Sequence, residues 1–463
     1  MQKQNDSRFA TDSIPHLILS LSTPAIAAQL INALYNVVDR IYIGRIPEVG
    51  TLAFTGVSVT FPIIMIVSAF AALIGYGGAP LASIRMGEGK LEEAEQMLGN
   101  CFAMLCTVSV LLTTILFLFQ TPLLLLFGAS ADTLPFAQGY LNIYLWGTLG
   151  VQISLGMNSF ISAQGFAKTA MGTVCIGAAL NILLDPILIF GFGMGVRGAA
   201  LATILSQMIS AVWVLKFLLS ERGKLRLQRK YLRIRPAIAA SALALGLSPF
   251  IMQSTESLVQ ISFNKSLQAY GGDLYVGAMG IMSSIMQFFM MPIQGFAQGA
   301  QPIISYNYGA QNFSRVKAAI RYMTIFCVGG ATLFWIITIF FPAIPVRLFS
   351  NDPAVVTLAC STMRIFFLGM LLMGFQMAFQ QSFIALGQAK VSILIAVLRK
   401  LVLLIPLVLL LPQIISPKTM AVIIAEPIAD ATAATTCCIL FAIKYKKLLC
   451  QPPKNERETD STT

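Results

Sequence analysis

Charged residues are scarce in this sequence, and their scarcity excludes a soluble protein. Only 11% of the 463 residues are charged, 57% are hydrophobic, and the mean hydropathy is +0.78. Soluble domains carry about 25% charged residues. So few charges cannot cover a water-exposed surface of this size. We therefore expect lipid to be the solvent for much of the protein surface, with the bilayer as a partner.

The residue patterns that carry most catalytic and metal chemistry are also missing. The single histidine is His16, and no phosphate-binding loop, metal motif or nucleophile elbow is present. Most of the eight cysteines lie within apolar runs, as small packing residues do. The sequence therefore predicts a protein that is not an enzyme and has no cofactor. A source of energy from ATP bound by this chain is likewise not expected.

Long apolar runs are what the chain has in abundance. Twelve of them reach the length of about 20 residues that a membrane-spanning helix needs. The runs are continuous, unlike the short alternating segments of barrel strands, so we expect helices throughout. The sequence thus predicts an all-α integral membrane protein with twelve transmembrane helices. The predicted spans are 16–43, 52–79, 97–120, 137–163, 169–191, 197–220, 237–268, 275–302, 319–346, 359–386, 391–413 and 419–443.

The cations gather on one side of this twelve-helix arrangement. The connections and termini on that side carry 22 lysines and arginines, against six on the other side. Cytoplasmic segments of membrane proteins carry such an excess, so we expect a multi-pass protein of the cell membrane with both termini in the cytoplasm. The net charge of +12 therefore reflects topology, and we expect no nucleic-acid partner.

The chain repeats itself at an offset of 222 residues without a gap. "GGAPLASIRMG" at 77–87 returns as "GAQPIISYNYG" at 299–309, and "AQGFAK" at 163–168 returns as "ALGQAK" at 385–390. Each half has six spans, so both halves enter the membrane from the same side as parallel repeats. Two pseudo-symmetric six-helix lobes are typical of transporters, whose site lies between the halves.

The repeat divides the chain into five predicted segments. Two of them are the lobes, and a basic connection joins the lobes. The segments are a cytoplasmic N-terminus at 1–15, an N-lobe at 16–220, a basic cytoplasmic linker at 221–236, a C-lobe at 237–443 and a cytoplasmic tail at 444–463.

The first span carries a polar face. At 100° per residue, Asn32, Asn36 and Asp39 fall on one side of the helix, and Tyr35 can share that side. Pro24 removes a backbone hydrogen bond and can bend the helix there. This face either lines a cavity or holds a neighbouring helix by hydrogen bonds.

The fifth and sixth spans supply polar groups at a similar depth. Asn181 and Asp185 lie one turn apart on one face, and Pro186 leaves carbonyl groups without their usual donor. Thr203 lies early in the sixth span. Because Asp39 and Asp185 both lie late in spans of the same direction, we expect them to share one pocket that takes a proton or a small cation.

The second half does not repeat these polar groups. At offset 222, Asp39 becomes Ile261, Asn181 becomes Leu403 and Asp185 becomes Leu407. A purely architectural role should have been duplicated, so the difference favours a functional role for the two aspartates.

Other polar groups mark the C-lobe. Gln253, Glu256 and Gln260 share one face of the seventh span, and Glu256 lies near the middle of the membrane. It either binds a proton or a cation, or is hydrogen-bonded inside the bundle. Gln287 lies among methionines and phenylalanines that suit apolar cations, although most of these pack helices.

Five charged residues of the last three spans allow two interpretations. Glu426 and Asp430 share one face of the last span, and Arg364, Arg399 and Lys400 lie nearby. Ion pairing among them is at least as well supported by the sequence as a role in transport.

These patterns resemble the multidrug and toxin extrusion (MATE) family over about residues 15–445. The resemblance is carried by "TPAIAAQLINALYNVVDRIYIG", by "NILLDPILIFGFGMGVRGAALATILSQ" and by the duplicated segments that begin at Gly77 and Gly299. It implies two six-helix lobes and drug export coupled to H+ or Na+.

The resemblance also implies roles for single residues. Asp39, Asn181, Asp185 and Thr203 match the family's ion site in the N-lobe, and Tyr140 and Asn158 are implied as further members of that lobe's cavity. Pro24 matches a proline at which the first helix bends. Glu256 resembles an acid of other branches, which place a cation site in the C-lobe.

We therefore expect a monomeric secondary antiporter that exports organic cations by rocker-switch alternating access. The alternative is a flippase for lipid-linked oligosaccharides or peptidoglycan precursors. Such a flippase has to receive a pyrophosphate, so cations should line its cavity, whereas the charges within these spans are mainly acids.

Overall fold

The computed structural model describes residues 8–350 and 352–449. The first residues of the predicted N-terminal segment 1–15 and most of the predicted tail 444–463 therefore lie outside the described residues.

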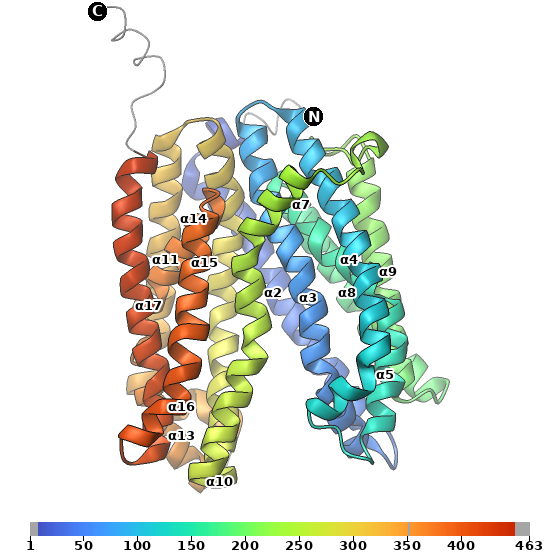
Figure 1. Ribbon diagram of the computed structural model, residues 1–463, viewed down its shortest axis with the longest axis vertical. Coiled ribbons are helices and arrows are strands. Elements are labelled where there is room, and N and C mark those ends of the chain that lie inside the picture. The colour runs from blue at the N-terminus through green and yellow to red at the C-terminus, as the bar shows by residue number, and fades with distance from the viewer. Residues whose placement is uncertain (1–7, 351, 450–463) are drawn as a thin grey trace, which may run out of the picture. The chain divides into compact units, whose positions relative to one another are not determined.

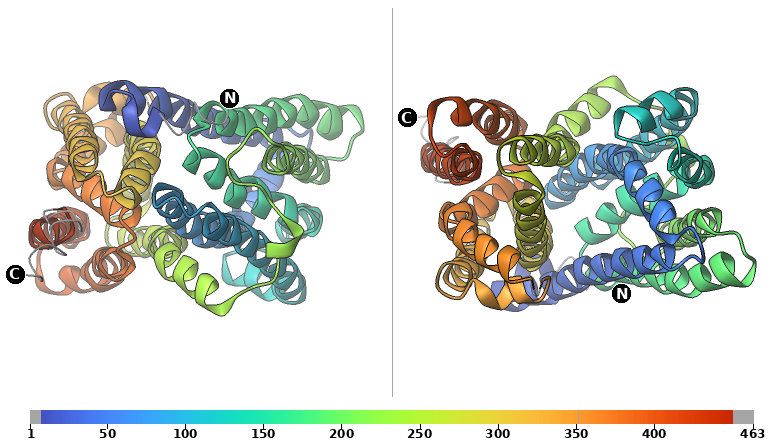
Figure 2. Two further views of the ribbon diagram at one scale, coloured as in Figure 1. Left: turned by 90° about the horizontal axis from the view of Figure 1, so that it is seen from above. Right: turned by 90° about the horizontal axis from the view of Figure 1, so that it is seen from below.

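All regular structure in the described residues is helical (Figure 1 and Figure 2). The first half contains α2 (Ile14–Gly44), α3 (Gly50–Gly87), α4 (Leu91–Leu126), α5 (Leu134–Trp146), α6 (Thr148–Gln152), η1 (Ile153–Met157), α7 (Asn158–Ala163), α8 (Ala167–Pro186), η2 (Ile187–Gly191), α9 (Val196–Leu219) and η3 (Arg229–Tyr231). The second half contains α10 (Pro236–Gly309), α11 (Phe313–Phe340), α12 (Ala343–Arg347), α13 (Pro353–Phe366), α14 (Met370–Ala385), α15 (Ala389–Val397), η4 (Leu398–Leu404), α16 (Ile405–Ile414) and α17 (Lys418–Leu449).

Each of the twelve predicted spans coincides with helix. Nine helices in the described residues are long and apolar enough to cross a membrane, and the pair α13 and α14, bent by 54°, makes a tenth. The long α10 holds two predicted spans, because its backbone breaks at Gly272, where φ is 71°. Positive φ is accessible mainly to glycine, which explains why the break falls at Gly272. The fourth predicted span is the interrupted run α5 to α7.

The described chain divides into two compact units, one for each half of the repeat. The first contains residues 23–86 and 90–254, and the second contains residues 9–22, 87–89 and 255–449. The predicted lobe boundaries were 16–220 and 237–443. The units differ from these boundaries because the start of α2 packs in the second unit and the start of α10 packs in the first.

Close helix crossings explain this exchange. In the first unit, a Cβ at Gly77 would overlap the Ala242 carbonyl oxygen, and a Cβ at Gly246 would overlap the Leu73 carbonyl oxygen. Phe70 and Phe250 pack edge to face beside this crossing, with ring centroids 5.0 Å apart. Only glycine lets α3 and α10 approach this closely.

The second unit repeats the crossing with the start of α2. A Cβ at Gly299 would overlap the backbone of Ser22, and the Ser22 Oγ donates a hydrogen bond of 3.0 Å to the Phe296 carbonyl oxygen. Gly77 and Gly299 are equivalent at offset 222. The repeated glycine therefore marks the place where the second span of each half crosses the first span of the other half.

The predicted basic linker 221–236 is docked onto α4 within the first unit. The Glu95 carboxylate accepts hydrogen bonds from the Arg226 backbone N–H at 3.1 Å and from the Gln228 amide at 2.6 Å. The Tyr231 hydroxyl lies 2.9 Å from the Glu92 carboxylate, to which it donates. Burial lowers the pKa of Lys224 to about 8. The linker is thus an ordered part of the first unit.

We predict that Gly77→Ala and Gly299→Ala each destabilise the protein by about 1–3 kcal/mol, because the added methyl group meets backbone that cannot move aside. Thermal unfolding of the purified protein in detergent measures the effect. Gly280→Ala is the matched control, because nothing lies within 4 Å of its added Cβ. Equal melting temperatures for all three variants would contradict the crossing.

Candidate functional site

Two carboxyl groups meet inside the first unit. Asp39 lies near the end of α2, and Asp185 is the last residue before Pro186 ends α8. The two carboxyl groups lie within hydrogen-bonding reach of one another. Asp185 is fully buried. The structure therefore brings Asp39 and Asp185 together inside the first unit, as the sequence predicts, and their place in a pocket stays a prediction.

The local backbone places Asp185 at an irregular point of its helix. Pro186 has no N–H group, and the chain continues from it into the π-helical turn η2. π-Helical turns are rare and occur frequently at functional sites. The sequence indicated the loss of a backbone donor at Pro186 but not the wide turn that follows.

Polar neighbours extend the pair across α8 and α9. The Asn181 amide nitrogen lies 3.5 Å from the Asp185 Oδ1 and 3.3 Å from the Thr203 hydroxyl. The Thr203 hydroxyl in turn donates to the Ala199 carbonyl oxygen at 3.0 Å. The predicted set of Asp39, Asn181, Asp185 and Thr203 thus forms one connected cluster, which we call the aspartate cluster.

Tyrosines cover one side of the aspartate cluster. Tyr140 of α5 lies close enough to Thr203 to interact with it, is only 4% exposed and stacks on Tyr144 with ring centroids 6.1 Å apart. Tyr35 of α2 lies close enough to interact with both carboxyl groups. The resemblance implied a place for Tyr140 in this lobe, and the structure puts it at the cluster.

Three oxygen atoms of the cluster lack a partner. Among the described residues, Asp39 Oδ1, Asn181 Oδ1 and Asp185 Oδ2 are shielded from solvent and accept no hydrogen bond. The neighbouring Arg40 places its guanidinium over the Phe61 ring at 5.1 Å. Buried acceptors without a donor are costly, and two adjacent carboxylates repel each other. A shared proton or a small cation would satisfy this arrangement.

Several other predicted residues lie away from the aspartate cluster. Asn158 hydrogen-bonds the Ala170 carbonyl oxygen at 3.1 Å and the Thr173 hydroxyl at 2.9 Å. Thr173 precedes Asp185 on α8 by about three helical turns, roughly 18 Å. Asn158 therefore joins α7 to α8 and is not part of the cluster. Asn32 and Asn36 are exposed on α2, and Asn36 donates to the Asn32 carbonyl oxygen at 2.7 Å.

The remaining predicted polar residues lie along α10. Gln253 is half-buried in the part of α10 that belongs to the first unit. The Gln260 amide is 3.5 Å from the Asn264 side-chain oxygen, and Gln287 is exposed. Pro24 lies inside α2, just after the point where this helix passes from one unit into the other.

The second unit contains a different cluster, made of ion pairs. The Arg399 guanidinium is 2.7 Å from the Asp430 carboxylate and 3.3 Å from that of Glu426. The Lys400 ammonium is 2.8 Å from the Glu256 carboxylate. These five residues, the ion-pair cluster, lie on α10, η4 and α17. Ion pairing, one of the two interpretations that the sequence left open, is thus what the structure contains.

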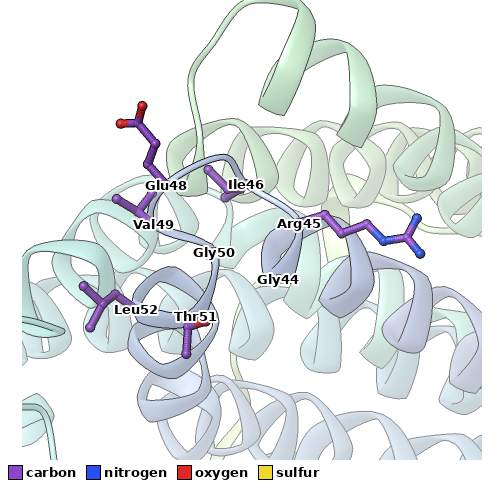
Figure 3. A pocket seen from close by; sticks show the side chains of 8 residues that line it. All are labelled: Gly44, Arg45, Ile46, Glu48, Val49, Gly50, Thr51 and Leu52. Carbon is purple, nitrogen blue, oxygen red and sulfur yellow. The ribbon is translucent and has the colours of Figure 1, made fainter.

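A shallow hollow of about 330 Å³ lies at the turn between α2 and α3 (Figure 3). It follows the last residues of α2 and is lined by Gly44, Arg45, Ile46, Glu48, Val49, Gly50, Thr51 and Leu52. The Arg45 and Glu48 side chains point away from each other in Figure 3. The hollow does not include the aspartate cluster.

Comparison with known proteins agrees with this architecture. The family model described as MatE matches residues 24–187 and 249–410. The multidrug export protein MepA of Staphylococcus haemolyticus (strain JCSC1435) is 25% identical over 390 residues, which cover 84% of this chain and 85% of that protein. MepA of Staphylococcus saprophyticus is 26% identical over 401 residues, covering 85% and 86%.

Solved structures share the fold. The MATE multidrug transporter DinF-BH superposes with a TM-score of 0.87 at 35% identity and covers 96% of this chain and 98% of its own. A MATE protein in the bent conformation superposes with a TM-score of 0.88 at 22% identity, with coverage of 95% and 97%.

We predict that Asp185→Asn stabilises the protein at alkaline pH. At high pH the two carboxylates of the wild type repel each other, whereas the asparagine amide is neutral and can donate to Asp39. The melting temperature of the wild type should fall as the pH rises, and that of the variant should fall less. Asp132→Asn, an exposed residue before α5, is the control and should follow the wild type. Parallel curves for all three proteins would exclude contact between ionisable carboxyl groups.

Proposed function

This chain belongs to the multidrug and toxin extrusion family, and on that premise we propose that it is a secondary antiporter that exports organic cations in exchange for H+ or Na+. The observation that carries the proposal is the contact between Asp39 and Asp185 inside the first unit, with carboxylate oxygens that lack a donor. Two adjacent carboxylates favour the binding of one positive charge between them, because it relieves their repulsion.

The coupling step follows from the charge of the aspartate cluster. With both aspartates ionised, the cluster attracts an organic cation. When a proton or Na+ binds there, the negative charge that holds the organic cation is reduced, and the organic cation is released. Each positive charge that moves inward through a membrane potential of 100 mV supplies about 2.3 kcal/mol, and each organic cation that moves outward costs the same. A one-for-one exchange is therefore driven by the concentration gradient of the coupling ion. Exchange of one cation for the other at the same carboxylates therefore links the gradient to export.

Pro24 gives α2 a place to respond to ion binding. Proline leaves the carbonyl group one turn earlier without its backbone donor, so the helix bends there at low cost. Asp39 lies on the same helix, about four turns further along. We propose that neutralising Asp39 changes the bend at Pro24 and favours the rocker-switch movement of the two lobes.

The charges within the spans favour a cationic substrate over a pyrophosphate. Arg399 and Lys400 are the buried cations among the described residues of the second unit, and both are held by carboxylates. Neither is offered to an anionic ligand. The contacts thus give no support to the alternative, a flippase for lipid-linked precursors.

We also propose where the protein lies in the cell. The excess of lysine and arginine in the connections of one side supports a cell-membrane protein with both termini in the cytoplasm. Each unit contains its own polar cluster, so we propose that a monomer is active and that no cofactor other than the coupling ion is used.

We predict that Asp39→Asn and Asp185→Asn each abolish ion-driven efflux, because the cluster then lacks the second carboxylate needed to hold a cation. Proteoliposomes loaded with ethidium measure efflux under a proton gradient or a sodium gradient, imposed separately. The gradient that drives efflux identifies the coupling ion. Asp132→Asn is the control and should transport as the wild type does.

Two outcomes would contradict the proposal. Normal efflux by both aspartate variants would show that the aspartate cluster does not couple ion movement to export. Ohmic current, or efflux that neither gradient accelerates, would show that the protein is not an antiporter. Recovery of folded protein in the detergent extract shows that each variant reaches the membrane.

A further inference from the structure

The two units place their charged clusters at the same junction of three helices. In the first unit the aspartate cluster lies where the first, fifth and sixth spans meet, on α2, α8 and α9. In the second unit the ion-pair cluster lies on α10, η4 and α17, which are the equivalent first, fifth and sixth spans at offset 222. No polar residue of one cluster is repeated in the other.

The positions of the two clusters correspond closely along all three helices. Glu256 is equivalent to Leu34, five positions before Asp39. Lys400 is equivalent to Ala178, three positions before Asn181. Glu426 is equivalent to Ile204, one position after Thr203.

These three displacements all point toward the same end of the bundle, because the sixth span runs opposite to the first and the fifth. The largest of them is five residues, about 1.4 helical turns. The clusters are therefore related by the repeat, although their residues differ. The equivalents of Arg399 and Lys400 in the first unit are the small residues Gly177 and Ala178, which supply no charge.

What distinguishes the second junction is that it contains its own cations. Arg399 and Lys400 are 4% and 5% exposed, and each lies within salt-bridge distance of a carboxylate. Among the carboxylates, Asp430 and Glu426 are also buried, whereas the Glu256 side chain is 63% exposed. Lys400 thus holds a carboxylate that remains reachable from outside the cluster.

We propose that the second unit contains a cation site at Glu256, equivalent to the aspartate cluster, and that the ammonium group of Lys400 is its permanent occupant. Arg399 pairs with both Glu426 and Asp430, so the two cations of the ion-pair cluster stand beside three carboxylates. The ligand class of this site is a small monovalent cation or an alkylammonium group. Lysine is a compact point charge on a flexible chain, which suits it to take the place of a free ion.

A tethered cation cannot leave, so Glu256 keeps its partner Lys400 through the cycle, while the first unit exchanges its ion. This consequence rests on the proposed antiport at Asp39 and Asp185. The occupancy of Glu256 by Lys400 does not, and it is tested without transport.

Removal of the tethered ammonium should open the site to a free one. Lys400→Ala leaves Glu256 without its partner and leaves room where the lysine chain was. We expect methylammonium chloride to raise the melting temperature of purified Lys400→Ala in a concentration-dependent way, since a ligand that binds only the folded state stabilises it. Choline chloride at equal ionic strength is the salt control, because its cation is too bulky for the space.

The matched control is Glu256→Gln/Lys400→Ala, which lacks both charges. It should melt at the same temperature in methylammonium chloride and in choline chloride, as should the wild type. Sodium chloride in a parallel series shows whether the opened site takes a metal cation as well as an alkylammonium. No specific effect of methylammonium on Lys400→Ala, or an equal effect on the double variant, would overturn the proposal.

A second comparison decides the question if Lys400→Ala does not yield folded protein. The Glu256 side chain is 63% exposed, so loss of the lysine leaves a carboxylate that is only partly desolvated. Lys400→Arg keeps a cation at the site and should melt at a higher temperature than Lys400→Gln. Equal yields and melting temperatures for the arginine and glutamine variants would show that no cation is needed beside Glu256.

Failure of this inference and failure of the proposed function are separate results. Methylammonium binding is measured on protein in detergent, whereas antiport is measured by ethidium efflux from proteoliposomes. If Asp39→Asn loses efflux and methylammonium has no effect on Lys400→Ala, the proposed antiport is supported and the tethered cation is excluded. If Asp39→Asn retains efflux and methylammonium stabilises Lys400→Ala, the tethered cation is supported and the proposed antiport is excluded.

Discussion

A carboxylate inside an apolar bundle needs a positive charge or a proton beside it, and this requirement underlies both clusters of the protein. Transfer of an ionised carboxyl group into hydrocarbon costs several kcal/mol, so an acid within a span is retained only with a partner. Asp39 and Asp185 are each other's neighbours, with oxygens that lack donors. Glu256, Glu426 and Asp430 have basic partners from their own chain.

The two units therefore meet one electrostatic requirement in two ways. On the proposed antiport, the first leaves the positive charge to a ligand, which makes its charge variable. The second supplies two cations from η4, and the one beside Glu256 is tethered. A duplicated bundle in which both sites were variable would have to empty and fill twice in each cycle. The repeats keep the glycine crossings at Gly77 and Gly299, which hold the helices together. They differ in the polar residues at this junction.

Much of the fold followed from local sequence patterns. The apolar runs predicted all twelve spans, and the repeat predicted two halves. The pairing of Asp39 with Asp185 was also predictable, because both lie late in parallel spans and Asn181 is one turn from Asp185. Only the resemblance implied a place for Asn158 in the cavity of this lobe, and that place stays a prediction. Its hydrogen bonds to Ala170 and Thr173 lie about three turns from Asp185. The docking of the linker on Glu95 left no periodic signal, since it depends on backbone N–H groups of a loop.

The sequence by itself determined which residues lie in helices, at what depth, and on which face, because helical periodicity and the thickness of the bilayer are local constraints. Only the tertiary structure decided which faces meet. The start of α2 lies in the second unit, and salt bridges join Lys400 to Glu256 and Arg399 to Asp430. The rotation and crossing of helices are set by side-chain packing at their contacts, such as Gly299 against Ser22. The sequence of a single helix does not specify which other helix it will pack against.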